Sequence, residues 1–157
     1  MTAEIRNCDC LELRTARSAD LTDVLALLGR AQLPIAGVAE ALSHFVVAER
    51  EGKLVGVAGL EIYGASALLR SVAVDDSWRG SGVGRTLIDR ALGQARQAGI
   101  EDVFLLTTTA EHYFPRFGFS CVSRDVVTEQ IRGSVEFQGA CPASAVVMRK
   151  SLSGDQS

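Results

Sequence analysis

The sequence has no excess of basic residues, no long apolar run and no export signal at its start. Its 16 Lys and Arg are offset by 19 Asp and Glu, which leaves a net charge of -3 over 157 residues. A nucleic-acid surface needs clustered, unopposed cations. A membrane span needs roughly 18 consecutive apolar residues, and an export signal needs a basic start before an apolar stretch. We therefore expect a cytoplasmic protein with no nucleic-acid or membrane partner.

Cysteine is scarce, and its spacing matches neither a zinc site nor a disulfide framework. Cys8 and Cys10 form a C-x-C pair, whereas Cys121 and Cys141 stand alone. Zinc ribbons and small secreted domains space their cysteines in a different way. We expect ordinary thiols and no metal, with Cys121 and Cys141 packed as small hydrophobic core residues. The alternative for the C-x-C pair is contact with a soft metal or an arsenical.

Hydrophobic residues make up 47% of the chain, and they fall in short runs without internal repeats. This length is enough for one sizeable core but too short for two ordinary domains. We expect one domain over residues 1–150, followed by a frayed tail over residues 151–157.

The order of the apolar runs predicts an α/β domain. A hairpin is expected over residues 45–60, because two β-type runs flank a polar turn. A strand over 67–74 is followed by a helical repeat over 87–95 that ends at Gly99. The apolar run 103–106 should pair parallel with the earlier strand, since a helix connects the two. The other expected elements are strands at 11–16, 119–122 and 145–148 and helices at 21–28 (capped by Ser18 or Asp20), 35–42, 110–117 and 126–132.

A glycine-rich segment, Arg79-Gly80-Ser81-Gly82-Val83-Gly84, precedes the helical repeat. Backbone N–H groups at a helix N-terminus suit a diphosphate, and glycines let the backbone approach it closely. Arg79 and Arg85 can add charge-assisted hydrogen bonds. The segment lacks both the G-x-G-x-x-G spacing of dinucleotide-binding folds and the Gly-Lys-Ser/Thr of a Walker loop. It therefore predicts a diphosphate loop of another kind.

Two stretches of the chain resemble motifs of the GNAT (Gcn5-related N-acetyltransferase) family. Residues 69–84 resemble motif A, whose loop reads Arg/Gln-x-x-Gly-x-Gly/Ala, and Arg79, Gly82 and Gly84 occupy its defining positions. Residues 107–119 resemble motif B, which ends in Gly-Phe.

The resemblance implies a GNAT fold, a mixed sheet of about six or seven strands flanked by helices. Its central strands, here 68–74 and 103–106, should splay apart around the pantetheine arm of acetyl-CoA, the implied cosubstrate. The residues assigned to acetyl-CoA in this way are Val72, Ala73, Val74, Arg79, Gly80, Ser81, Gly82, Val83, Gly84, Arg85, Thr86, Thr107, Phe114 and Arg116.

The acid that protonates the departing thiolate is not obvious. Many GNAT members have a tyrosine five positions before the motif B phenylalanine, where this chain has Phe114. Tyr113 is the candidate, although adjacent helical residues point about 100° apart. A water, the hydroxyl of Thr107 or Thr108, or unassisted departure are the alternatives.

The candidates for the base that deprotonates the amine are Glu61, acting directly or through water, and His112. The alternatives are that each is a solvated surface residue and that the amine loses its proton to water. Arg70 and Thr108 are the candidates for binding the acceptor, because a guanidinium suits a carboxylate or an oxyanion. The threonines at 107–109 could instead cap the next helix.

Residues 105–114 and 141–145 resemble a narrower group, the N-acetyltransferases found with bacterial arsenic-resistance genes, in which phenylalanine is usual at position 114. These also resemble the acetyltransferase domain of N-acetylglutamate synthase. A small α-amino acid acceptor is implied, such as an arsenic- or phosphorus-containing glutamate analogue. The alternatives are acetylation of a protein or peptide amine and a catalytically silent regulator that binds acetyl-CoA or an arsenical. Family members often pair C-terminal edge strands, so 145–148 is the expected strand of a homodimer.

Overall fold

The computed structural model describes residues 11–78, 80–108, 110–134 and 145–152. Two compact units make up the chain, Met1–Gly59 with Ser71–Ala91 and Leu60–Arg70 with Leu92–Ser157. We describe each unit by itself.

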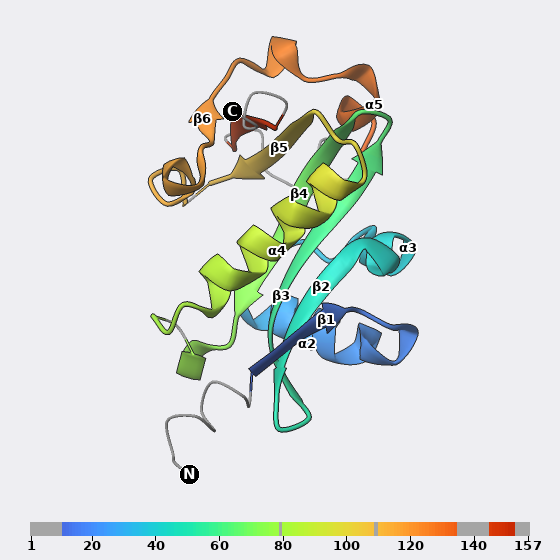
Figure 1. Ribbon diagram of the computed structural model, residues 1–157, viewed down its shortest axis with the longest axis vertical. Helices are drawn as coiled ribbons and strands as arrows, with labels where there is room; N and C mark the ends of the chain where they lie inside the picture. Colours follow the sequence, from blue (N-terminus) through green and yellow to red (C-terminus); the bar gives the residue numbers. More distant parts are fainter. Residues whose placement is uncertain (1–10, 79, 109, 135–144, 153–157) are drawn as a thin grey trace. The chain divides into compact units, whose positions relative to one another are not determined.

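Seven strands form one mixed sheet in the order β1-β2-β3-β4-β5-β7-β6 (Figure 1). The strands are β1 (Leu11–Thr15), β2 (Phe45–Arg50), β3 (Lys53–Tyr63), β4 (Ser66–Val74), β5 (Asp102–Thr107), β6 (Ser120–Cys121) and β7 (Val146–Ser151). The helices are α2 (Leu21–Arg30), α3 (Val38–Ala41), α4 (Val83–Gln97) and α5 (Glu129–Arg132). Short 3-10 turns are η1 (Ser18–Asp20), η2 (Leu42–His44), η3 (Asp76–Trp78), η4 (Phe114–Phe117) and η5 (Arg124–Val126). The predicted α/β fold, a mixed sheet flanked by helices, is confirmed.

The first unit is built on the antiparallel strands β1, β2 and β3. The hairpin predicted over residues 45–60 is present, with a register shift between Ala48 and Glu49. Strand β2 is buried because its apolar side chains lie in the main core of this unit. That core consists of Ala16, Val24, Leu27, Leu28, Val38, Leu42, Phe45, Val47, Val57 and Ala73.

Asp20 was expected to cap α2, and the structure gives its carboxylate another role. It accepts no hydrogen bond from the N-terminal backbone of α2. It instead binds both terminal nitrogens of Arg14, at 2.7 and 2.9 Å, and the backbone N–H of Arg17 at 2.7 Å. Arg14 also donates to Glu49 at 2.6 Å. The Arg14 guanidinium lowers the pKa of Asp20 to about 2, and the same contact raises the pKa of Arg14.

The second unit contains the parallel contact that the helical crossover predicted. Strands β4 and β5 pair at Ser66 with Asp102, Ala67 with Val103 and Leu68 with Phe104. That ladder ends at Leu68, although β5 continues to Thr107. The parallel ladder therefore joins three residues of each strand. A second core fills this unit with Leu68, Phe104, Val127, Ile131 and Val147.

Strand β7 is an interior strand, so the expectation that residues 145–148 offer a free edge for a homodimer was wrong. Met148 pairs with Leu105 of β5 on one side and with Cys121 of β6 on the other. Both sides of Met148 are therefore paired with strands of the same chain. Strand β7 runs one residue beyond the expected boundary at 150, and Leu152 is buried. Residues 153–157 of the expected tail lie outside the described residues.

The prediction of a buried Cys121 was also wrong. This residue lies in β6, a two-residue strand at the edge of the sheet, and its side chain is exposed. The other three cysteines lie outside the described residues, and with them the C-x-C pair. The expected helix over 110–117 is shorter than predicted, a 3-10 turn that ends at Gly118, whose φ is 93°.

Candidate functional site

The predicted diphosphate loop leads directly into α4. Gly80 and Gly82 have φ values of 81° and 91°, in the left-handed region that side chains disfavour. A Cβ on either residue would meet nothing within 4 Å, so backbone conformation rather than crowding requires glycine. Helix geometry leaves the first N–H groups of α4 without intrahelical acceptors. Such a helix N-terminus suits an anion.

A glycine in β3 fixes the position of this helix N-terminus. A Cβ on Gly56 would lie 2.7 Å from Cδ1 of Leu87 and 3.0 Å from Cγ1 of Val83, both in α4. Val83 and Leu87 are buried, so the first turns of α4 pack directly on the strand. Sequence analysis missed this role of Gly56. The signal was a glycine inside an otherwise apolar strand, which often marks close backbone approach.

Several loop groups are already bonded within the loop. The hydroxyl of Ser81 donates to the carbonyl oxygen of Trp78, and the Ser81 N–H donates to the same oxygen at 3.2 Å. The hydroxyl of Thr86 donates to the carbonyl oxygen of Gly82 at 2.9 Å. Arg85 is exposed, whereas Arg79 lies outside the described residues. The donors that helix geometry leaves for an anion are therefore backbone groups at the start of α4.

The strand before the loop bends at Ser71. This buried residue has a φ of 59°, which is uncommon for a residue other than glycine. The predicted pantetheine contacts follow it: Val72 and Val74 are partly exposed, and Ala73 is buried. The bend interrupts the regular alternation of side chains along β4 and redirects the backbone of these three residues.

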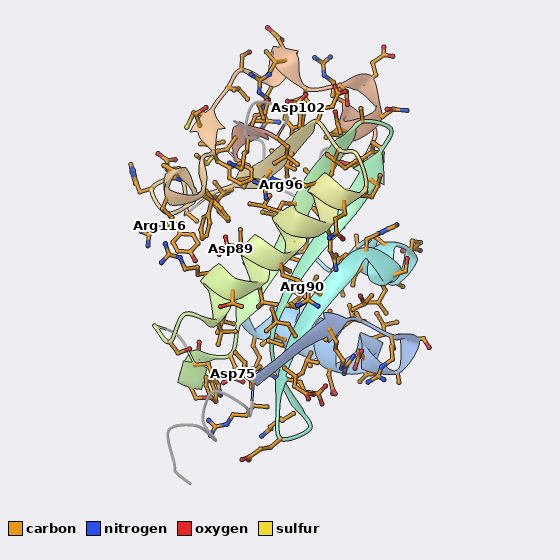
Figure 2. The ribbon with its side chains drawn as sticks, viewed as in Figure 1. Asp75, Asp89, Arg90, Arg96, Asp102 and Arg116 are labelled. Carbon is orange, nitrogen blue, oxygen red and sulfur yellow. The ribbon has the colours of Figure 1, made fainter. Side chains whose placement is uncertain are left out.

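Asp75 organises the turn between β4 and the loop (Figure 2). One carboxylate oxygen accepts from the Ser77 backbone N–H at 3.0 Å and from the Ser77 hydroxyl at 2.8 Å. These bonds lower the pKa of Asp75. The other oxygen lies 3.5 Å from Arg30, and the Asp75 N–H donates to the carbonyl of Val55 at 2.8 Å. The loop thus starts from a turn held to α2 and β3.

In the second unit, Glu61 and Arg70 form a buried ion pair. Nη1 of Arg70 donates to Oε2 of Glu61 at 2.7 Å, and the Arg70 side chain has no exposed surface. The hydroxyl of Tyr63 donates to the other oxygen of Glu61. The structure thus brings the base candidate and the acceptor-binding candidate together. Sequence analysis missed Tyr63, although residues 61 and 63 share one face of a strand by simple alternation.

The motif B residues form an aromatic cluster. Tyr113, Phe114 and Phe117 have ring centroids 5.3 to 6.4 Å apart. Phe114 is buried against Phe119 as well. The guanidinium of Arg116 lies 4.5 Å from the Tyr113 ring centroid (Figure 2). The site of the family's usual tyrosine is therefore filled by a packed phenyl ring, and Tyr113 lies under a cation.

The remaining candidates lie in more open positions. His112 has a side chain that is 95% exposed and is 3.7 Å from Glu111. The Thr107 hydroxyl accepts a hydrogen bond from the backbone N–H of Ala110 at 2.9 Å, so it caps the following turn. Thr108 is exposed, and Thr109 lies outside the described residues.

No metal-binding cluster of three or more His, Cys, Asp or Glu side chains occurs within the described part of the chain. Across the same residues, every helix is too short or too polar to cross a membrane.

Comparison with known proteins adds a family and several relatives. Residues 41–121 match the acetyltransferase (GNAT) domain family. The chain is 33% identical to an amino-acid acetyltransferase of Mycobacterium tuberculosis over 141 residues, which cover 83% of this chain and 80% of that protein. It is 28% identical to the amino-acid acetyltransferase of Escherichia coli over 62% of its own length, but it spans just 22% of that longer protein.

Solved structures give the same fold. One M. tuberculosis protein in complex with CoA superposes with a TM-score of 0.78 and 27% identity, over 90% of this chain and 99% of that one. N-acetylglutamate synthase of Neisseria gonorrhoeae, in complex with coenzyme A and N-acetyl-glutamate, superposes with a TM-score of 0.79 at 24% identity. The latter match covers 90% of this chain and 35% of the synthase, and it shows the fold alone.

Proposed function

The chain belongs to the GNAT family of acetyltransferases, and we propose that it transfers the acetyl group of acetyl-CoA to the primary amine of a small α-amino acid. The amine would attack the thioester carbonyl directly, with both substrates bound. The carbon–sulfur bond breaks as the new amide bond forms, and the products are an N-acetyl amino acid and CoA. The observation that carries this proposal is the glycine loop that opens α4, in a chain related to amino-acid acetyltransferases.

The loop supports the cofactor half of the proposal. Left-handed glycines at 80 and 82 precede a helix of 15 residues, whose dipole and first N–H groups favour a diphosphate. Neither glycine has a neighbour within 4 Å of where a Cβ would lie. We propose Arg79 and Arg85 as additional phosphate ligands, and the backbone of Val72 to Val74 as the partner of the pantetheine amides.

Arg70 supports the acceptor half of the proposal. An arginine is well suited to hold a planar carboxylate, and this one is held in a fixed position by Glu61. The Arg70 side chain has no exposed surface. For an acceptor to reach the guanidinium, the side chains that cover it have to move. We propose that the α-carboxylate of the acceptor binds this guanidinium. The narrower sequence resemblance adds arsenic- and phosphorus-containing glutamate analogues to the candidate acceptors.

Glu61 is the base that we propose, because it is buried and held by two donors, Arg70 and Tyr63. It would take the proton that the amine loses on attack, directly or through water. His112, the other candidate, has a side chain that is 95% exposed, with Nε2 3.7 Å from Glu111. For the departing thiolate, Tyr113 or a water is the proposed proton donor.

The test measures thiol release from acetyl-CoA against a panel of amines. The panel contains glutamate, its arsenic and phosphorus analogues, other amino acids, common antibiotics and a peptide with a free N-terminus. Glutamate α-amide is the matched control, since it keeps the amine and removes the carboxylate proposed to bind Arg70. We expect turnover with an amino acid and at least about a tenfold lower kcat/KM with its α-amide. Turnover with the peptide or an antibiotic alone would refute the acceptor class, and calorimetry without CoA binding would refute the cofactor site.

A further inference from the structure

The residue just before the diphosphate loop is Trp78, the one tryptophan of the chain. Its backbone N–H donates to the carbonyl oxygen of Asp75 at 2.8 Å. Its own carbonyl oxygen accepts both the N–H and the hydroxyl of Ser81, a loop residue. The position of Trp78 therefore determines where the first half of the loop begins to turn.

The side chain of Arg50 covers the indole ring of Trp78. Its guanidinium carbon lies 4.7 Å from the ring centroid, within the range of a cation–π contact. Arg50 ends β2, and the contact lies wholly within the first unit. Arg50, from a distant part of the sequence, thus contacts Trp78, whose carbonyl oxygen accepts the hydrogen bonds from Ser81 of the loop.

The arginine at this position carries a cost. Its Nε is buried and, among the described residues, has no hydrogen-bond partner. A buried donor left in this state is unfavourable, and a purely aliphatic side chain would avoid that cost. The stack on Trp78 is a favourable contact that requires the cation. The presence of an arginine here therefore points to its contact with Trp78, the residue that precedes the loop.

We propose that Arg50 is a positioning residue for the cofactor loop. Stacked on Trp78, it holds the loop in its binding geometry before acetyl-CoA arrives. A loop ordered in advance loses less conformational freedom on binding, and affinity rises accordingly. This inference rests on the proposed function of the loop in binding the CoA diphosphate.

The central variant is Arg50→Met, which keeps an unbranched apolar stem and removes both the cation and the buried Nε. We expect its affinity for CoA, measured by calorimetry, to fall about tenfold. Its thermal midpoint should stay equal to that of the wild type or rise. Arg50→Lys, which keeps a cation near the ring, should recover part of the affinity. A merely structural role would lower the midpoint and leave the affinity of the folded protein unchanged.

Trp78 supplies an independent readout, because the fluorescence of the chain's one tryptophan reports on this turn. In Arg50→Met the free protein should emit at longer wavelength and be quenched more readily by acrylamide, a neutral quencher, as the ring loses the guanidinium. Arg90→Met is the matched control, since it removes the same charge from an exposed position on α4 (Figure 2). The control should match the wild type in both CoA affinity and fluorescence.

The outcomes separate the inference from the function on which it rests. Wild-type binding with an unchanged affinity in Arg50→Met would overturn the role of Arg50 and leave the cofactor site intact. An equal loss in Arg90→Met would also overturn it, because net charge would then be the cause. Absence of CoA binding in the wild type itself would overturn the proposed function, and the inference with it.

Discussion

The cofactor loop and the Glu61–Arg70 pair are built in opposite ways. The loop uses consecutive residues whose backbone is proposed to bind the cofactor, and Gly80 and Gly82 lie in open space with left-handed φ values. The pair joins side chains from β3 and β4, both buried, with Tyr63 as a third member. The loop therefore depends on backbone conformation, whereas the pair depends on charge that is removed from water.

This difference predicts whether a substitution should weaken cofactor binding or folding. A change in the loop should weaken cofactor binding more than it weakens folding, because little packs against the glycines. A change in the pair should weaken folding first, because an unpaired buried charge is strongly unfavourable. Arg70→Met and Gly82→Val test whether the two regions separate in this way, and Asp20→Asn and Thr107→Val extend the comparison to polar contacts outside both regions.

The largest effect is expected from Arg70→Met. Removing one partner of a buried ion pair typically costs about 3–5 kcal/mol, because the other charge is left without compensation. Urea unfolding at pH 7 should show this loss in the free energy of unfolding. The double variant Arg70→Met with Glu61→Leu should recover a large part of it. A loss below about 1 kcal/mol would mean that the pair behaves like an exposed one.

The next effect is expected from Gly82→Val. A β-branched residue strongly disfavours a φ of 91°, and its side chain would occupy the space proposed for the diphosphate. CoA affinity measured by calorimetry should fall at least about 100-fold, near 2.7 kcal/mol. Gly93→Ala is the control, a helix position of α4 that is open within 4 Å and has no left-handed φ. It should bind CoA as the wild type does, and equal losses in both variants would contradict the loop assignment.

A smaller effect is expected from Asp20→Asn in the unit that contains the loop. The pKa of Asp20 is lowered from 3.8 to about 2, so its carboxylate stabilises the fold above pH 3.8 and loses that contribution as the pH falls through 2. At pH 7 the free energy of unfolding of Asp20→Asn should be about 2 kcal/mol lower than that of the wild type.

Two comparisons check this result. The difference between Asp20→Asn and the wild type should shrink steadily between pH 4 and pH 2, whereas the exposed control Asp89→Asn should differ little at any pH. CoA affinity should stay unchanged. A pH-independent difference would show that lost packing, rather than the charge pair with Arg14, is the cause.

The smallest effect is expected from Thr107→Val. Its hydroxyl accepts the backbone N–H of Ala110, so the variant should lose about 0.5–1.5 kcal/mol of stability. Thr107→Ser should retain the bond and the stability. The CoA affinity of Thr107→Val decides between the two interpretations of this residue. If the hydroxyl only caps the turn, the affinity should stay unchanged, and if it contacts the cofactor, the affinity should fall.

Sequence analysis predicted the loop well because its residues are adjacent in the chain. Positive φ values at Gly80 and Gly82, and a helix that begins at Val83, follow from local backbone rules. Gly56 and Arg50 act on the same loop and were missed, since they come from other strands. Sequence spacing predicted the hairpin and the parallel pairing of β4 with β5, but it does not show which side chains of separate elements come into contact.

Cys121 and residues 145–148 show the same limit in the sheet. The small hydrophobic character of cysteine suggested a buried thiol, and the family resemblance suggested an edge strand at 145–148, but strand order put Cys121 at the edge and β7 between two neighbours. An edge and an interior strand can share the same composition. What separates them is the pairing of their backbone groups.

The sequence by itself determined the family, the α/β class and the glycine-rich turn before α4, because each depends on local patterns of glycine and apolar residues. Tertiary structure decided that Arg70 and Tyr63 both donate to Glu61. It also decided that Gly56 lets α4 pack closely on β3, and that Arg50 covers Trp78. The physical reason is that these contacts join residues that are far apart in the sequence or lie in different elements. Their energies arise from burial and close approach, which exist once the chain has folded.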